Sequence, residues 1–256
     1  MAVHAEKVAV CVGSATGMGA ETCIRLAAEG AFIVLGDINV MASEALIETI
    51  GKAGGQALFQ ACDITSEAQV EALMRTAVET YGGVDLMHVN AADLSQAIVL
   101  NDKDALNTEL AVFDRTLDVG LRGHLLCTRA AIPHMQARGK GSIVYTSSAA
   151  SKTASSTQFS YYVMKAGLNG LMRHVAHRWG SEGIRANAVC PGYVLTETVR
   201  RNMTEMKYES ALRRTHSTRL GDPKDISSLV SFLLSDEAEW INGQAVSVDG
   251  GSVMHG

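Results

Sequence analysis

The sequence lacks several features that would place it in a specialised class. Its cysteines are odd in number and show no CxxC spacing, so we expect buried thiols rather than a disulfide framework or a metal site. They are Cys11, Cys23, Cys62, Cys127 and Cys190. An excess of positive charge is also absent: a net charge of −5 and an isoelectric point near 5.9 argue against a dedicated nucleic-acid binder.

Long apolar segments are missing as well. No uninterrupted apolar run is long enough to span a bilayer, and the first residues lack the apolar core of a signal peptide. We therefore expect a cytoplasmic protein with no membrane partner. Linkers, repeats and low-complexity tracts are also absent, so we assign the 256 residues to one domain, 1–256.

Apolar, strand-like runs alternate with segments of helical periodicity over almost the whole chain. With 47% hydrophobic residues, the chain can bury a substantial core. Strands are expected at 7–12, 32–37, 56–62, 84–91, 141–147, 185–190 and 244–249. Helices are expected at 17–29, 41–53, 66–81, 121–138, 160–182 and 224–235. Such alternation predicts an α/β fold, a doubly wound parallel sheet of about seven strands with helices on both faces.

Two longer segments, 93–111 and 196–219, interrupt the alternation. Long excursions after strands tend to be functional lids or oligomer contacts, and we expect these two to wall a substrate pocket. The second segment is rich in arginine and lysine, but Glu197, Glu205 and Glu209 are interspersed among them. A solvated helical face is therefore expected there rather than an anion site.

A glycine-rich loop joins the first expected strand directly to the first helix. Its sequence is Gly13-Ser14-Ala15-Thr16-Gly17-Met18-Gly19. Glycines allow a tight turn and a close approach of the backbone to a pyrophosphate, and the N-terminus of the following helix favours the phosphate charge. The loop predicts a dinucleotide-binding site. We expect cofactor contacts from Gly13, Ser14, Thr16, Gly17, Met18 and Gly19.

Asp37 ends the second expected strand and suggests which dinucleotide binds. A carboxylate at this position can accept hydrogen bonds from both adenosine ribose hydroxyls, and it repels a 2′-phosphate. Neither Ser14 nor Ile38 supplies a cation for that phosphate, so NAD is expected rather than NADP. The alternative is that Asp37 only caps a loop. Further cofactor contacts are expected from Ile38, from Asp63 with Ile64 beside it, and from Asn90, Ala91 and Ala92 after the fourth strand.

Tyr161 and Lys165 are four residues apart, which places both on one face of a helix. A phenol normally ionises near pH ~10, and an adjacent ammonium favours the phenolate. The pair can then pass a proton to or from an alcohol or ketone oxygen, and the hydroxyl of Ser148 could bind the same oxygen. Alone, the pair is more often a contact on a helix surface. A dinucleotide bound at the glycine loop would give the pair a redox partner, which supports a catalytic site.

Taken in order, these motifs resemble the short-chain dehydrogenase/reductase family over nearly the whole chain. The resemblance is carried by the Gly13/Gly17/Gly19 loop, Asp37, Asp63, Asn90-Ala91, Ser148, Tyr161-x-x-x-Lys165, Pro191-Gly192 and Val248-Asp249-Gly250-Gly251. It implies a Rossmann-type sheet with Tyr161 as general acid/base, Ser148 polarising the substrate carbonyl and Lys165 binding the nicotinamide ribose. It also implies cofactor contacts at Pro191, Gly192, Val194 and Thr196, and a homotetramer (or homodimer).

The chain departs from the family pattern at three places. Val12 stands where a threonine is usual, and Val89-Asn90-Ala91-Ala92 replaces Asn-Asn-Ala-Gly. Gly120 stands where the family generally has a catalytic asparagine, which helps hold a water that links the lysine to solvent. Glycine keeps its backbone carbonyl and would leave room for an extra water, so we still expect an active enzyme.

The main hypothesis is an NAD(H)-dependent oxidoreductase that interconverts a secondary alcohol and a ketone by hydride transfer. Its partner would be a small-molecule alcohol or ketone. Apolar residues in the two interrupting segments, such as Leu94 and Met203, hint at a cyclic or sterol-like substrate. One alternative is an NADPH-dependent 3-oxoacyl-thioester reductase, which Asp37 disfavours. The other is a catalytically silent dinucleotide-binding sensor or scaffold, which Gly120 supports.

Overall fold

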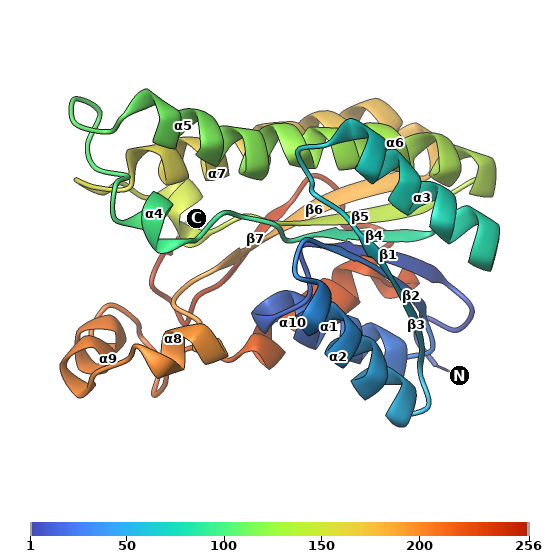
Figure 1. The fold of residues 1–256 in the computed structure, drawn as a ribbon, viewed down its shortest axis with the longest axis horizontal. Coiled ribbons are helices and arrows are strands. Elements are labelled where there is room, and N and C mark those ends of the chain that lie inside the picture. Colours follow the sequence, from blue (N-terminus) through green and yellow to red (C-terminus); the bar gives the residue numbers. More distant parts are fainter. Residues whose placement is uncertain (1, 255–256) are drawn as a thin grey trace.

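The computed structural model describes residues 2–254, and its centre is a seven-stranded sheet in which all neighbouring strands are parallel (Figure 1). The strand order is β3-β2-β1-β4-β5-β6-β7. The strands are β1 (Val8–Val12), β2 (Phe32–Asp37), β3 (Gln56–Ala61), β4 (Leu86–Val89), β5 (Gly141–Thr146), β6 (Ile184–Pro191) and β7 (Ala245–Val248). Every residue of β1, β4 and β5 is buried, which explains why their sequences are nearly continuous apolar runs.

Helices cover both faces of the sheet, as Figure 1 shows. One layer contains α1 (Gly17–Ala28), α2 (Val40–Lys52) and α10 (Pro223–Leu234). The other contains α3 (Glu67–Tyr81), α6 (Gly123–Arg138) and α7 (Phe159–Trp179). Side chains alternate along β1: Val8, Val10 and Val12 join one core, while Ala9 and Cys11 join the other. The expected doubly wound, Rossmann-type sheet is confirmed.

The long helix expected at 121–138 is more complex than its periodicity indicated. It begins as α5 (Leu110–Leu117), passes through a π-helical turn, η1 (Asp118–Arg122), and continues as α6. Gly120 lies inside this turn, and π-helical turns occur often at functional sites. The remaining short helices are α4 (Gln96–Val99), η2 (Ala149–Lys152), η3 (Gly180–Glu182), α8 (Glu197–Arg201), α9 (Glu205–Leu212) and η4 (Asp236–Ala238).

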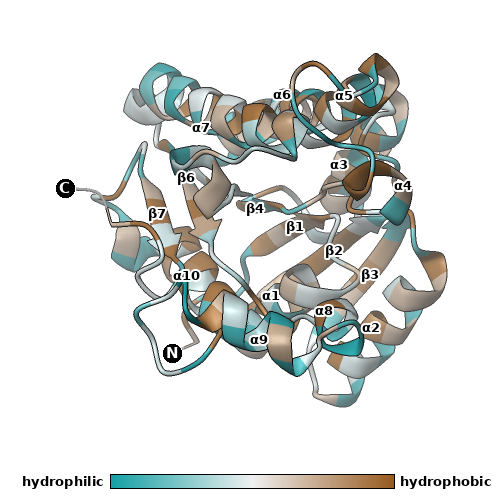
Figure 2. Cartoon of the chain, turned by 90° about the vertical axis from the view of Figure 1, so that its left-hand side faces the viewer, coloured by the Kyte–Doolittle hydropathy of each residue, from teal (hydrophilic) through white to brown (hydrophobic). Residues whose placement is uncertain are grey.

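The distribution of hydropathy agrees with this layered arrangement. Figure 2 shows brown, hydrophobic strands between helical layers that carry both brown and teal residues. All five cysteines are free and buried, as expected. Within residues 2–254, the helices are all too short or too polar to cross a bilayer.

Candidate functional site

The candidate site residues gather at one edge of the sheet, where the strands have their carboxyl ends. The glycine loop follows β1, Asp37 ends β2, and Asp63 comes shortly after β3. Asn90–Ala92 follow β4, Ser148 follows β5, and Pro191–Thr196 begin at the last residue of β6. The strand order reverses between β1 and β4, and ligands of open α/β sheets bind in the crevice at such a point.

The glycine loop packs closely against the segment after β4. Gly13 has φ +69°, and a Cβ added there would lie 2.4 Å from the Cα of Ala91, so only glycine fits. The side-chain Nδ2 of Asn90 donates to the carbonyl of Gly13 at 2.8 Å, which ties the loop to β4. Gly13, Asn90 and Ala91, all predicted to contact the cofactor, therefore pack directly against one another.

The start of α1 can accept an anionic group. Thr16 precedes the helix without making a side-chain cap, so the first N–H groups of α1 remain available to a ligand. The Oδ1 atom of Asn90 is buried and has no hydrogen-bond partner among residues 2–254, which leaves a polar atom for the same ligand. These groups fit the pyrophosphate and polar edges of a dinucleotide.

Asp37 reaches back from the end of β2 to the glycine loop. Its Oδ2 accepts the N–H of Ala15 at 2.9 Å, and its Oδ1 accepts the N–H of Asn39 at 2.9 Å. The carboxylate thus caps the loop, which is the role that the alternative interpretation of Asp37 assigned to it. Each oxygen keeps a further lone pair for a ligand hydroxyl, so the two roles are compatible. Neither the buried Ser14 nor the exposed Ile38 brings a positive charge.

Asp63 and Ile64 lie at the neighbouring strand end. The Oδ1 atom of Asp63 accepts both the N–H and the hydroxyl of Thr65, at 2.9 and 2.8 Å. The backbone hydrogen bond from Thr65 is the main cause that holds the pKa of Asp63 below its ordinary value. Ile64, the next residue, is buried. Both residues therefore have fixed positions at the end of β3, where the sequence predicts cofactor contacts.

Lys165 lies on α7 with Tyr161, one turn further along the helix. Its Nζ donates to the carbonyl of Thr146 at 2.7 Å and lies 5.6 Å from the centroid of the Tyr161 ring. Only 2% of the lysine is exposed. Burial lowers the pKa of Lys165 to about 8, so its ammonium is mostly protonated at neutral pH. The positive charge is therefore held beside the phenol.

Ser148 lies at the end of β5 and faces the same phenol. Its Oγ accepts the N–H of Ala150 at 3.1 Å, which leaves the hydroxyl proton free to be donated. Burial raises the pKa of Tyr161, and hydrogen bonding with Ser148 opposes part of the rise. The pKa of Tyr161 is raised overall, because desolvation of the phenolate is the largest effect. The sequence, which shows only the neighbouring ammonium, predicts a lowered pKa instead. The structure brings Ser148, Tyr161 and Lys165 together.

The segment after β6 lies beside the end of β7 and beside the glycine loop. The N–H of Gly192 donates to the carbonyl of Val248 at 3.1 Å, and Val194 pairs with Gly221 in a short parallel bridge. Gly17, at φ +58°, faces Thr196: a Cβ there would lie 3.2 Å from the Cγ2 of Thr196. The glycine loop and the segment from Pro191 to Thr196 are thus neighbours in space.

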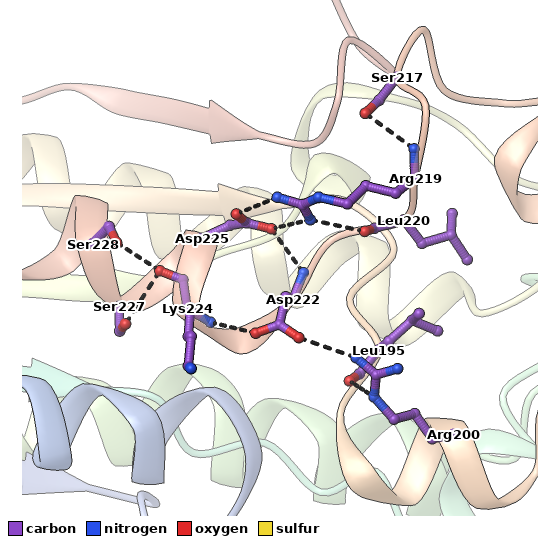
Figure 3. A network of polar contacts seen from close by, with 10 residues as sticks. All are labelled: Leu195, Arg200, Ser217, Arg219, Leu220, Asp222, Lys224, Asp225, Ser227 and Ser228. Carbon is purple, nitrogen blue, oxygen red and sulfur yellow. Dashed lines mark hydrogen bonds and ion pairs between the residues drawn. The ribbon is translucent and has the colours of Figure 1, made fainter.

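Four of the arginines in the segment 196–219 pair with carboxylates of the chain itself: Arg200, Arg201, Arg213 and Arg219. Figure 3 shows Arg200 and Arg219. Arg219 binds both oxygens of Asp225, at 2.7 and 2.8 Å. Arg200 donates to Asp222 at 3.0 Å, and Asp222 also caps the start of α10. Arg200 is exposed on α8, as a solvated helical face requires, whereas Arg219 is exposed in the loop before α10 rather than on a helix.

The space beside Gly120 differs from the expectation. A glycine there predicted room for an extra water, but the side chain of Met164 lies in the direction that a side chain at 120 would take. Met164 is buried on α7, next to Lys165. The expected room is therefore filled by a neighbouring apolar side chain, which sequence spacing could not show.

Three further residues near the site had no signal in the sequence. The Nε2 atom of buried His88 is 2.9 Å from the hydroxyl of Thr146, whose carbonyl binds Lys165. His124, on α6, is fully buried near these groups. Asp102, in the segment 93–111, binds the start of α7. The partners of His88 and Asp102 are distant in sequence, so no local spacing reveals these two residues.

Comparison with known proteins agrees with this geometry. A family model described as enoyl-(acyl carrier protein) reductase matches residues 13–253. A probable short-chain type dehydrogenase/reductase of Bradyrhizobium diazoefficiens is 40% identical over 249 residues, which cover 97% of this chain and 88% of the relative. The chain belongs to the short-chain dehydrogenase/reductase family.

Two further relatives of this dehydrogenase/reductase have names that describe dehydrogenases of ring compounds with a hydroxyl group. The cis-4-hydroxycyclohexanecarboxylate dehydrogenase of Sinomonas cyclohexanicum is 35% identical, over 96% of each chain. A 7α-hydroxysteroid dehydrogenase, solved with NADH and 7-oxoglycochenodeoxycholic acid, is 32% identical with a TM-score of 0.91, and the match covers 98% of this chain and 96% of that one. The fold and the family's oxidoreductase chemistry are thereby shown.

Proposed function

We propose that this protein is an NAD(H)-dependent oxidoreductase that interconverts a secondary alcohol and a ketone by hydride transfer. The observation that carries the proposal is the closeness of the Tyr161 side chain to both the Ser148 hydroxyl and the Lys165 ammonium. This group lies at the same sheet edge as the glycine loop. A proton donor and a dinucleotide site at one edge are the two parts that such a reaction needs.

NAD is proposed over NADP because of Asp37. Its carboxylate is held at the mouth of the glycine loop by two N–H groups, where it would bind the ribose hydroxyls and repel a 2′-phosphate. The 7α-hydroxysteroid dehydrogenase solved with NADH supports the same choice. When bound, the nicotinamide supplies the atom that accepts or gives the hydride.

In the proposed reaction, the chain's own residues bind the substrate oxygen and move its proton. Tyr161 takes the hydroxyl proton during oxidation and returns it during reduction, which is typically worth ~10²–10⁴-fold in rate. Ser148 donates a hydrogen bond to the same oxygen. Lys165 adds the charge that stabilises the phenolate as it forms and would bind the nicotinamide ribose. The other residues proposed to hold the cofactor are Gly13, Ser14, Thr16, Gly17, Met18, Gly19, Asp37, Ile38, Asp63, Ile64, Asn90, Ala91, Ala92, Pro191, Gly192, Val194 and Thr196.

One observation favours a second candidate, a reductase of acyl thioesters. The matching family model is described as an enoyl-(acyl carrier protein) reductase, and a 3-oxoacyl-(acyl carrier protein) reductase of Thermotoga maritima is 29% identical over 97% of this chain. A 3-oxoacyl-thioester reductase would be expected with NADPH, so the cofactor preference separates the two candidates. A silent sensor is the third possibility, because Gly120 removes the usual asparagine.

The test is a titration with NADH and NADPH, followed by turnover of a panel of cyclic secondary alcohols, measured as absorbance of the reduced cofactor. We expect tight NADH binding, weak NADPH binding and turnover of at least one alcohol. A preference for NADPH would favour the thioester reductase. Binding without turnover of any alcohol or ketone would favour the sensor. Cytoplasmic location, a single domain and assembly as a homotetramer or homodimer stay predictions.

A further inference from the structure

The start of α7, the helix that carries Tyr161, is capped by a segment that is distant in sequence. The first N–H groups of a helix have no partner within the helix and need one from elsewhere. Here four successive N–H groups bind the pair Asp102-Lys103. The bonds run from Gln158 to the Asp102 carbonyl at 2.9 Å, from Phe159 to the Lys103 carbonyl at 3.0 Å, from Ser160 to Asp102 Oδ1 at 2.9 Å, and from Tyr161 to Asp102 Oδ2 at 3.0 Å.

This arrangement differs from the other capped helices of the chain. The α10 helix is capped by the adjacent Asp222, and α2 by the adjacent Asn39. Gln158, which immediately precedes α7, makes no side-chain cap and has φ +61°. That backbone conformation is unfavourable for a residue other than glycine and needs support from its surroundings. The two backbone bonds to Asp102 and Lys103 provide this support.

The carboxylate of Asp102 is well suited to this task. The residue is only 5% exposed, and each carboxylate oxygen accepts one N–H of α7. An anionic group is stabilised at a helix N-terminus, and charge-assisted hydrogen bonds are stronger than neutral ones. A buried carboxylate is costly without such partners. Asp102 and the first turn of α7 therefore hold one another in place.

One of the two N–H groups that the carboxylate binds belongs to Tyr161 itself. The backbone from which the phenol projects is thus fixed directly by Asp102, while Lys165 lies one turn further along the same helix. Asp102 belongs to the segment 93–111, which interrupts the strand–helix alternation. A movement of this segment would be transmitted to the first turn of α7.

We propose that Asp102 is a positioning residue, which keeps the phenol of Tyr161 within reach of Ser148 and links the segment 93–111 to proton transfer. The proposal rests on the function proposed above. A misplacement of about 1 Å at a reacting group can cost about 10²-fold in rate. Loss of the cap is therefore expected to lower turnover without removing any group that touches the substrate or the cofactor.

The test compares Asp102→Asn and Asp102→Glu with the native protein. The asparagine has the same shape but presents an amide N–H₂ where α7 needs an acceptor. We expect kcat for alcohol oxidation to fall about 10- to 100-fold, with the Kd for NADH unchanged and the pH profile of kcat displaced. The glutamate keeps the charge and is expected to recover part of the rate. Unchanged NADH binding shows that Asp102→Asn is folded.

A matched control is available in the same segment. Asp104 is an exposed carboxylate that caps its own turn through the N–H groups of Leu106 and Asn107 and makes no hydrogen bond to α7. Asp104→Asn is expected to keep the native rate and pH profile. If kcat falls by the same factor in Asp102→Asn and Asp104→Asn, the effect is a general loosening of the segment, and the proposal is wrong.

A double variant separates this proposal from the function on which it rests. If Asp102 acts through Tyr161, Asp102→Asn should not lower the residual rate of Tyr161→Phe any further. An additional loss equal to that in the native background would overturn the positioning role. Normal turnover of Tyr161→Phe alone would overturn the proposed function. An inactive Tyr161→Phe together with a native-like Asp102→Asn would overturn only the role of Asp102.

Discussion

The side chain of Met164 occupies the position that a side chain at Gly120 would need. A Cβ added to Gly120 would lie 2.6 Å from the Sδ, 2.7 Å from the Cε and 2.8 Å from the Cγ of Met164. All three distances are shorter than carbon and sulfur atoms tolerate. Met164 is buried on α7, and its side chain packs against the π-helical turn at Gly120. The two residues are therefore complementary: a larger residue at 120 needs either a shift of the Met164 side chain within the packed core or a smaller residue at 164.

This relationship predicts that restoring an asparagine at 120 is harmful on its own. Gly120→Asn should destabilise the protein by roughly 1–3 kcal/mol, the usual cost of overfilling a packed core. In a Met164→Ala background, the same substitution should cost much less, because the clashing atoms are gone. Chemical denaturation of the four proteins measures the coupling. An equal loss in both backgrounds would show that the two side chains do not compete for space.

Removal of the charge on Asp37 should change the cofactor preference. Asp37→Asn keeps the shape of the side chain but loses the charge that repels a 2′-phosphate. We expect the Kd for NADH to rise about 10- to 100-fold, the usual value of hydrogen bonds to a charged group, and the Kd for NADPH to fall relative to it. Fluorescence titration gives both constants. Glu44→Gln, an exposed charge on α2, is the control and should leave the ratio unchanged.

The buried histidines should make the protein sensitive to acid. Burial lowers the pKa of His88 and of His124 to about 3, whereas an unfolded histidine titrates near pH ~6.5. Between these values the unfolded chain binds more protons, so stability falls as the pH falls below about 6.5. Each histidine should cost about 2 kcal/mol between pH ~7 and ~5.

Urea unfolding at several pH values tests the contribution of His124. The variant His124→Leu should lose about 2 kcal/mol less than the native protein between pH ~7 and ~5. His177→Gln, at an exposed site on α7, should keep the native pH dependence. The same pH dependence in His124→Leu as in the native protein would rule out the buried imidazole as a source of acid sensitivity.

Much of the fold was predictable because its signals are local. Buried parallel strands give continuous apolar runs, and the glycine loop lies between a strand and a helix. The succession of strands and helices along the chain and the α/β fold class could therefore be predicted from the sequence. Tyr161 and Lys165 could be paired because four residues make one turn of a helix. The family resemblance placed Ser148 and the cofactor segments at the same edge of the sheet.

Other features depend on contacts between distant parts of the chain and could not be predicted. The cap on α7 joins Asp102 to residues 58 and 59 positions later. The packing of Met164 against Gly120 depends on how α7 lies on the π-helical turn, and helical periodicity contains no sign of that turn. The charge of Lys165 predicts a lowered pKa for Tyr161, but burial raises this pKa, and burial is known only from the three-dimensional structure.

Proton transfer by Tyr161 in an NAD-dependent redox reaction can be measured directly. The measurement compares alcohol oxidation by the native protein and by Tyr161→Phe, with NADH binding measured on the same samples. We predict that kcat falls by at least about 10²-fold while the Kd for NADH stays within the error of the native value. Native-like turnover by Tyr161→Phe would contradict the account.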